Sequence, residues 1–187
     1  MIIEQKVTLE NMLNCREKRA EKQQYLLAKY HQPVVFISLV WPGEVKDSSA
    51  SRYVMELAVK TMNNAVEHLH LHASHYQCEH LITGPEAIYC LPIDNIGLSI
   101  LDLKKLCVRL ERAHPLGRLW DIDVINTHKR PISRSEVGLP PRRCLLCEKT
   151  AHLCARSHAH DVHTLINTIH RRIDEFKQRA GNWCYWP

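Results

Sequence analysis

The chain has 187 residues, which suits one globular domain with a core that needs no disulfides. Its 45% hydrophobic and 24% charged residues exclude wholesale disorder and collagen-like repeats. The net charge of +5 favours anionic partners but is too small to argue for nucleic acid. Neither a secretory signal nor an apolar stretch long enough to cross a bilayer is apparent, so we expect a cytoplasmic protein with no membrane or nucleic-acid partner.

The first predicted elements are two helices with a strand between them. Apolar spacing predicts a helix over residues 8–30, with Thr8 as its N-cap. The β-branched, apolar run 34–41 predicts a buried strand. A polar turn at 42–48 leads to a helix over about 50–72, whose apolar residues recur with a period near 3.6.

The middle of the chain predicts a strand pair, a helix and another strand. Segments 76–83 and 86–92 flank a Gly-Pro pair and are typical of a hairpin. Residues 102–113 carry leucines on one side and predict a helix. Residues 118–126 alternate apolar and charged side chains, which predicts a half-buried strand.

The last third predicts a short strand near 131–135, a loop over 136–160, and a helix from Asp161 to Gly181. Without the terminal helices, the elements follow a β-α-β-β-α-β order with one extra strand. We therefore predict an α+β fold, ferredoxin-like or nucleotidyltransferase-like, with helices on one face of the sheet. We expect the whole chain, 1–187, to form a single domain.

Two aspartates, Asp121 and Asp123, lie two positions apart on a predicted strand and so point to the same face. Neighbouring carboxylates repel unless a cation lies between them, and Mg²⁺ prefers carboxylates together with substrate phosphate oxygens. The pair therefore indicates phosphoryl or nucleotidyl transfer. The alternative interpretation is the solvated edge of a half-buried strand. His114, just upstream, is either a proton acceptor or an ordinary helix-end histidine.

The polar turn at 42–48 is a candidate anion site. Lys46 precedes the N-terminus of a predicted helix, and Arg52 lies one turn into that helix. Free amides at a helix start and nearby cations favour phosphate groups. The alternative is an ordinary strand-to-helix loop.

Residues 142–160, which we call the Cys/His segment, hold a candidate zinc site. Cys144 and Cys147 have the spacing of two cysteines that bind one Zn²⁺ ion. Cys154 and His160 would complete its tetrahedral coordination. The alternative is three reduced cysteines that pack the last helix against the sheet.

Four stretches together resemble one family. The sequence HPLGRLWDIDV is followed by LPPRRCLLCEKTAHLCARSHAH, and the upstream pieces PGEVKDS and TGPEA fit the same pattern. This combination is similar to the apo-citrate lyase phosphoribosyl-dephospho-CoA transferases, also called citrate lyase holo-acyl-carrier-protein synthases. The resemblance covers about residues 8–175.

The resemblance implies an enzyme that moves a phosphoribosyl-dephospho-CoA unit from triphosphoribosyl-dephospho-CoA to a serine of the citrate lyase acyl carrier (gamma) chain, with release of diphosphate. The resemblance carries over Arg118, Asp121 and Asp123 by position. From the residues themselves we expect Mg²⁺ on the aspartate pair, phosphate contacts from Arg118, and Asp121, Asp123 or His114 as the catalytic general base. The other site residues, matched by position or by the zinc spacing, are Lys46, Asp47, Arg52, Glu86, Gly117, Arg142, Arg143, Arg156, Cys144, Cys147, Cys154 and His160.

Two rival functions remain at this point. One is a nucleotidyltransferase that uses another donor. The other is a non-catalytic, zinc-stabilised module that binds an acidic partner through its basic C-terminal part, where residues 142–187 hold 8 Lys/Arg against 4 Asp/Glu.

Overall fold

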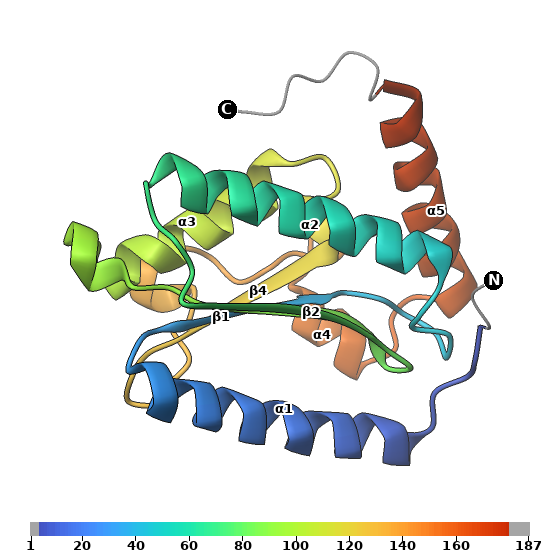
Figure 1. The fold of residues 1–187 in the computed structure, drawn as a ribbon. Helices are drawn as coiled ribbons and strands as arrows, with labels where there is room; N and C mark the ends of the chain where they lie inside the picture. The colour runs from blue at the N-terminus through green and yellow to red at the C-terminus, as the bar shows by residue number, and fades with distance from the viewer. Residues whose placement is uncertain (1–3, 180–187) are drawn as a thin grey trace.

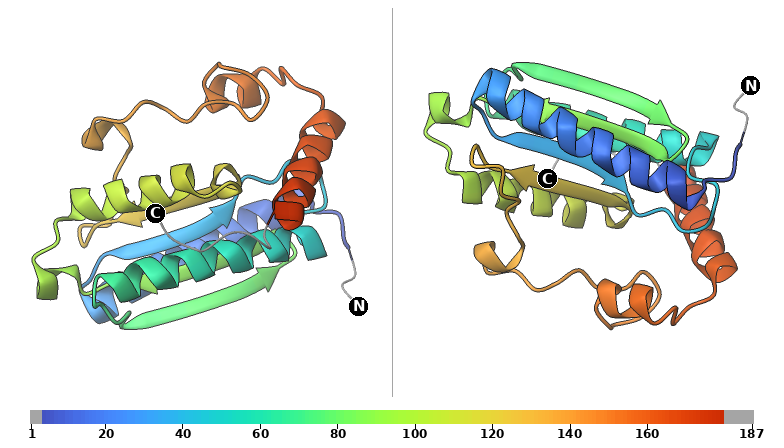
Figure 2. Two further views of the ribbon diagram at one scale, coloured as in Figure 1. Left: turned by 90° about the horizontal axis from the view of Figure 1, so that it is seen from above. Right: turned by 90° about the horizontal axis from the view of Figure 1, so that it is seen from below.

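The computed structural model describes residues 4–179 as an α+β fold in which a four-stranded antiparallel sheet carries helices on both faces (Figures 1 and 2). The predicted α+β class is therefore confirmed. The predicted end of the last helix at Gly181 lies outside the described residues. No helix between residues 4 and 179 combines the length and apolar character that a bilayer crossing requires.

The sheet has the strand order β2-β3-β1-β4, so β2 and β4 form its edges. Each pair of neighbouring strands is antiparallel. In the pairing of β1 with β4, Ser38 lies opposite Asp121 and Phe36 opposite Asp123. The strands are β1 (Val34–Leu39), β2 (His75–Leu81), β3 (Gly84–Cys90) and β4 (Trp120–Ile125).

Within residues 4–179, five α-helices pack around the sheet. Two of them cover one face and one covers the other (Figure 1). The short helix follows β4 in the chain, and the last helix lies against α2 and contributes Ile169, Ile173 and Phe176 to the core. Thr8 caps the first helix in a capping box with Asn11, as its sequence position predicts. The helices are α1 (Leu9–Tyr30), α2 (Ser49–His68), α3 (Ile100–Ala113), α4 (Ala151–Arg156) and α5 (Val162–Arg179).

The sheet is buried on both sides because its strands carry apolar residues at consecutive positions. On β1, Val35 and Ile37 face the main core beneath α2 and α3, whereas Val34 and Phe36 face a second, smaller core under α1. The two central helices α2 and α3 thus share one face, as predicted for the order without the terminal helices, and the N-terminal helix α1 covers the other. There α1 presents Leu26 and Leu27 to the strands.

Three local predictions also need correction. The hairpin turn is at 82–83, so Gly84, with φ of +107°, and Pro85 belong to β3. Pro85 is tolerated there because β1 pairs with β3 only from Ala87 onward. The strand expected near 131–135 is only an isolated bridge between Ile125 and Pro131. The expected loop 136–160 contains the short helix α4.

Candidate active site

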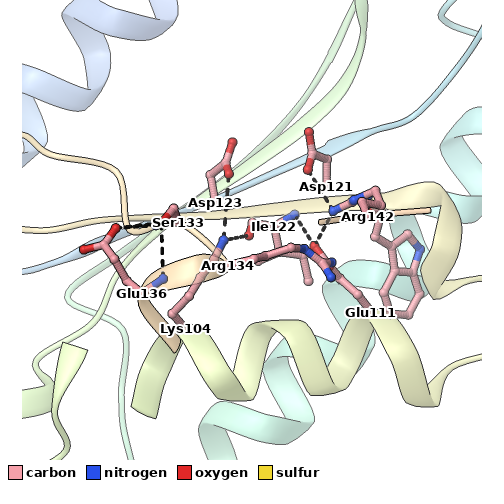
Figure 3. Close-up of polar contacts among 10 residues, drawn as sticks. Lys104, Glu111, Asp121, Ile122, Asp123, Ser133, Arg134, Glu136 and Arg142 are labelled. Atoms are coloured by element: carbon pink, nitrogen blue, oxygen red, sulfur yellow. Dashed lines mark hydrogen bonds and ion pairs between the residues drawn. The ribbon is translucent and has the colours of Figure 1, made fainter. Parts of the chain in front are cut away.

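The carboxylate pair is positioned by the alternation of β4. Trp120, Ile122 and Val124 are buried in the main core, so Asp121 and Asp123 point to the α1 side of the sheet (Figure 3). Their side chains retain 45% and 54% of their exposure. Partial loss of water contact and the adjacent Asp121 raise the pKa of Asp123. Such repulsion between neighbouring carboxylates is relieved when a cation binds between them.

Two cationic side chains reach the pair from the outer edge of β4. Nη2 of Arg142 donates to Oδ1 of Asp121 at 2.9 Å. Nζ of Lys104 lies 3.9 Å from Oδ1 of Asp123 and is itself buried. The carboxylates are thus bordered by fixed positive charge on the side away from β1.

The exposed edge of β4 is closed by side chains rather than by another strand. The amide of Ile122 donates to Oε1 of Glu111 at 2.9 Å, and its carbonyl accepts from Nζ of Lys104 at 2.9 Å. Nη1 of Arg142 donates to the carbonyl of Trp120 at 2.5 Å. These contacts pair the outward-facing groups of Ile122 and the carbonyl of Trp120, and the amide of Ile132 donates to the carbonyl of Val124 at 2.8 Å. An edge occupied in this way is protected from pairing with another chain.

Glu111 is the buried centre of this edge network. Its carboxylate accepts hydrogen bonds from Arg134 and, at 2.8 Å, from Arg142 (Figure 3). Burial raises the pKa of Glu111, and the two guanidinium groups and the amide of Ile122 oppose that shift. The carboxylate therefore holds two arginines in place beside the aspartate pair.

Two cavities lie on the α1 face of the sheet, which is also the face of the carboxylate pair. They are on the β1 side of the pair, away from Arg142 and Lys104. The larger, of about 450 Å³, lies between α1 and strands β2 and β3. The smaller, of about 140 Å³, includes Ser38, the residue paired with Asp121, together with Lys46 and Glu86. Arg19 of α1 lines both, forms an ion pair with Glu86, and stacks 4.5 Å above the ring of Phe36. The cavities thus extend along the same face as the carboxylates.

Lys46 and Glu86, both expected to bind substrate, are on the face that carries the carboxylates. The ammonium group of Lys46 donates to the carbonyl of Trp41, and burial lowers its pKa. Glu86 is nearly buried in its ion pair with Arg19.

The structure separates Asp47 and Arg52 from this group. Arg52 donates to both carboxylate oxygens of Asp47, at 2.8 and 2.6 Å. Arg52 also lines a cavity between α2 and residues Tyr76, Cys78 and His80 of β2. That cavity is on the opposite face of the sheet and at its opposite edge from β4. Convergence of Lys46 and Arg52 on the carboxylates, as expected from sequence, is therefore not observed.

His114 lies on the other side of β4 from the pair. Its ring stacks on Trp120 at a centroid distance of 4.5 Å and lies 5.1 Å from that of Phe176. Its Nδ1 accepts from the amide of Leu116 at 3.1 Å, and burial lowers its pKa to about 4. These contacts are those of a neutral core histidine.

The remaining motif residues extend from the start of β4 toward the Cys/His segment. Gly117 packs so closely on the backbone of Glu111 that a Cβ atom would lie 2.4 Å from that carbonyl oxygen. Arg118 donates to the carbonyl of Arg143, which in turn pairs with Glu148 at the surface. Arg156 is exposed on α4.

The Cys/His segment brings its four predicted ligands together. The ligand atoms of Cys144, Cys147, Cys154 and His160 all lie within 4.8 Å of one another. Sγ of Cys147 is 3.5 Å from Sγ of Cys154 and 3.3 Å from Nε2 of His160. Ligands of a tetrahedral zinc site are separated by roughly 3.5–3.8 Å, given Zn–S and Zn–N distances of about 2.3 and 2.0–2.1 Å. This set could therefore hold a metal such as zinc.

Sequence reasoning missed Lys104, Glu111 and Arg134 at the edge of β4, and Arg19 on α1. A signal existed for the first two. They lie seven residues apart on the side of α3 that carries Leu103 and Cys107, among residues buried in the core. A charged side chain on the apolar face of a helix requires a partner, and here the partner is the edge of β4.

Paired carboxylates beside gathered arginines are the arrangement expected of an enzyme that acts on phosphate compounds. Comparisons with known proteins give the particular family. The family model described as apo-citrate lyase phosphoribosyl-dephospho-CoA transferase matches residues 7–176. The chain therefore belongs to this family of transferases, as the sequence motifs predict.

Individual relatives agree. An apo-citrate lyase phosphoribosyl-dephospho-CoA transferase from Shigella boydii is 32% identical over 169 residues, which cover 90% of each chain. One from Escherichia coli strain SE11 matches with the same identity and coverage. "Protein CitXG" from Haemophilus influenzae is 36% identical over 182 residues, 96% of this chain but only 38% of that longer protein.

Proposed function

We propose that this chain transfers the phosphoribosyl-dephospho-CoA group from triphosphoribosyl-dephospho-CoA to a serine of the citrate lyase acyl carrier (gamma) chain, with release of diphosphate. The names of its relatives support the group transferred and the acceptor enzyme. The observation in the structure that carries the proposal is the side-by-side placement of Asp121 and Asp123 on β4, bordered by Arg142 and Lys104.

In the proposed reaction, the serine hydroxyl attacks the α-phosphorus of the triphosphate in line with the leaving group. A bond forms between the serine oxygen and this phosphorus, and the bond from the phosphorus to the bridging oxygen of the diphosphate breaks. The serine proton passes to a carboxylate of the pair, because His114 lies on the opposite side of β4. Arg142 and Lys104 offset the negative charge that develops.

We propose Mg²⁺ as the cation of the carboxylate pair. The donor set supports this, because two half-exposed carboxylates leave room for substrate oxygens and water around a hard cation. When bound, Mg²⁺ would polarise the phosphoryl oxygens of the donor. Asp121 and Asp123 would hold it from the α1 side of the sheet.

We also propose that the Cys/His segment holds one structural zinc ion through Cys144, Cys147, Cys154 and His160. Zinc would tie together a segment with little secondary structure. The amide of Leu146 lies 3.5 Å from Sγ of Cys144 and donates to it, a contact that favours the thiolate form needed for metal binding.

The finer fold assignment belongs to the proposal as well. Between Val34 and Ile125 the elements run β1, α2, β2, β3, α3, β4, and the sheet order read from its β4 edge is β4-β1-β3-β2. This order supports a ferredoxin-like arrangement with α1 and α5 as additions. We further expect a cytoplasmic location.

Mass spectrometry of the carrier chain tests the function directly. The carrier is incubated with this protein, triphosphoribosyl-dephospho-CoA and Mg²⁺, and a mass increase equal to the phosphoribosyl-dephospho-CoA group on one serine is expected. A carrier variant with alanine at that serine serves as the control. An unmodified wild-type carrier would contradict the proposal, and modification from a different nucleotide donor would favour the rival nucleotidyltransferase.

A further inference from the structure

A fourth cavity, of about 180 Å³, lies beyond the edge of β4, between α3 and the loop that leads into the Cys/His segment. Five of its nine lining residues are arginines, and Glu111 is the one carboxylate among them. We call it the arginine pocket. Its arginines are Arg112, Arg118, Arg134, Arg142 and Arg143.

The positive charge of the arginine pocket exceeds what its own carboxylate can offset. Glu111 forms ion pairs with both Arg134 and Arg142, and Arg142 forms a second ion pair with Asp121. Arg118 donates to a backbone carbonyl, that of Arg143. Burial, followed by repulsion from Arg142 and other arginines, lowers the pKa of Arg118. Like charges held together in a partly desolvated cavity are stabilised when an anion enters it.

The arginine pocket adjoins the carboxylate pair through Arg142. One of its nitrogens, Nη2, lies 2.8 Å from Glu111 on the pocket side and 2.9 Å from Asp121 on the other (Figure 3). An extended phosphate chain whose first phosphorus lies at the aspartates would therefore have its next phosphoryl groups beside Arg142, Arg118 and Arg134. Guanidinium groups donate two parallel hydrogen bonds to phosphate oxygens.

We propose that the arginine pocket is the subsite for the two terminal phosphoryl groups of the donor and, after transfer, for the leaving diphosphate. The assignment rests on the proposed function for its place in the reaction, but binding of diphosphate itself requires no transfer. The subsite would act by electrostatics and by the forked geometry of arginine, without a metal ion.

Isothermal titration calorimetry of the full chain with inorganic diphosphate in EDTA tests the proposal. We expect binding that weakens as salt rises, and weaker binding of orthophosphate, which reaches fewer guanidinium groups. Arg118→Gln should weaken diphosphate binding by roughly tenfold or more, the loss of a charged hydrogen bond. Arg118→Lys keeps the positive charge but cannot donate two parallel hydrogen bonds. Its affinity for diphosphate should therefore lie between those of Arg118→Gln and wild type. Arg118 is the preferred position because, unlike Arg134, it does not pair with buried Glu111.

Arg171→Gln is the matched control. Arg171 is 71% exposed on α5, pairs with Glu175, and is not among the lining residues, so diphosphate affinity should not change. Folding of each variant is checked by its melting temperature. Absence of diphosphate binding to the wild type, or equal affinity in Arg118→Gln and wild type, would overturn the proposal.

Aspartate variants separate this proposal from the proposed function. Asp121→Asn and Asp123→Asn should retain diphosphate binding in EDTA while losing transfer. Loss of diphosphate binding in both would move the anion site to the aspartates and overturn the arginine pocket. Failure of the wild type to modify the carrier, with diphosphate binding intact and dependent on Arg118, would contradict the function but leave the subsite standing.

Discussion

β4 and the Cys/His segment are held in place by different forces. On β4, the alternate residues Trp120, Ile122 and Val124 are 0–1% exposed, so the intervening carboxylates are positioned by the core. Within residues 142–160 only Cys154 is buried, and α4 is the only helix (Figure 2). The carboxylate pair is therefore positioned by the core, whereas the segment is held by a few backbone hydrogen bonds and by contacts among its cysteines and His160, where we propose the zinc ion.

The largest effect should follow from the carboxylates. Asp121→Asn and Asp123→Asn should each lower the transfer rate by roughly 10²-fold or more, because each removes a ligand of the proposed Mg²⁺ and a candidate acceptor of the serine proton. The melting temperature should stay close to that of wild type, since both side chains are about half exposed. Rates come from mass spectrometry of the carrier, and melting from circular dichroism.

Asp94→Asn is the control, because Asp94 is an exposed aspartate near α3 and outside the site. If both site variants turned over at near wild-type rates while still requiring Mg²⁺, the pair would be an ordinary strand edge.

For the Cys/His segment we expect the reverse: a substitution there should change the local structure strongly and the transfer rate less. Elemental analysis of the untagged chain should find about one zinc per molecule, and Cys147→Ser should lose it while the sheet still melts cooperatively. Protease cleavage should appear within residues 142–160. Transfer should fall by roughly tenfold, because Arg142, which bonds to Asp121, begins this segment.

Cys78→Ser provides the control, since Cys78 is half-buried on β2 outside the segment. Metal-free protein that is fully folded and active would assign these cysteines to packing, and the contrast between the two regions would disappear.

Lys46 and Arg52, which the sequence analysis assigns to one anion site, should differ in their smaller effects on donor binding. Lys46→Ala should weaken donor binding about tenfold, the loss of one charged contact, because Lys46 lines the cavity that contains Ser38. Arg52→Ala should leave donor binding nearly unchanged, because Arg52 pairs with Asp47 on the other face. Equal losses in the two variants, measured by calorimetry, would mean that the donor spans both faces.

The smallest effect on transfer should come from His114. Its pKa of about 4 in the folded state lies below the ordinary value of 6.5, so the unfolded chain binds a proton first as the pH falls. Its contribution to stability is complete above pH 6.5 and is lost between pH 6.5 and 4. We expect a loss on the order of 1–2 kcal/mol after discounting for partial contact with water.

His114→Phe, which retains an aromatic ring against Trp120, should flatten this part of the pH dependence of unfolding. It should leave the pH profile of transfer unchanged. A displaced transfer profile in this variant would return His114 to the list of proton acceptors.

Local sequence patterns determined most of the elements. The alternation around Asp121 and Asp123 indicates a strand with both carboxylates on one face, because side chains alternate along any strand. The spacing from Cys144 to His160 was enough to predict four ligands close together, because three of them are within eleven residues. Motif order was enough to indicate the family.

Tertiary structure decided which charges meet. Lys46 and Arg52 are six residues apart, yet a strand-to-helix turn sends them to opposite faces of the sheet. Glu111 and Arg134 meet Arg142 only because α3 packs beside β4 and the following loop returns along its open edge. Periodicity reports the face of a single element, but the partner of that face depends on the order of strands and the path of loops. For that reason the aspartate pair was visible in the sequence, and the arginine pocket beside it was not.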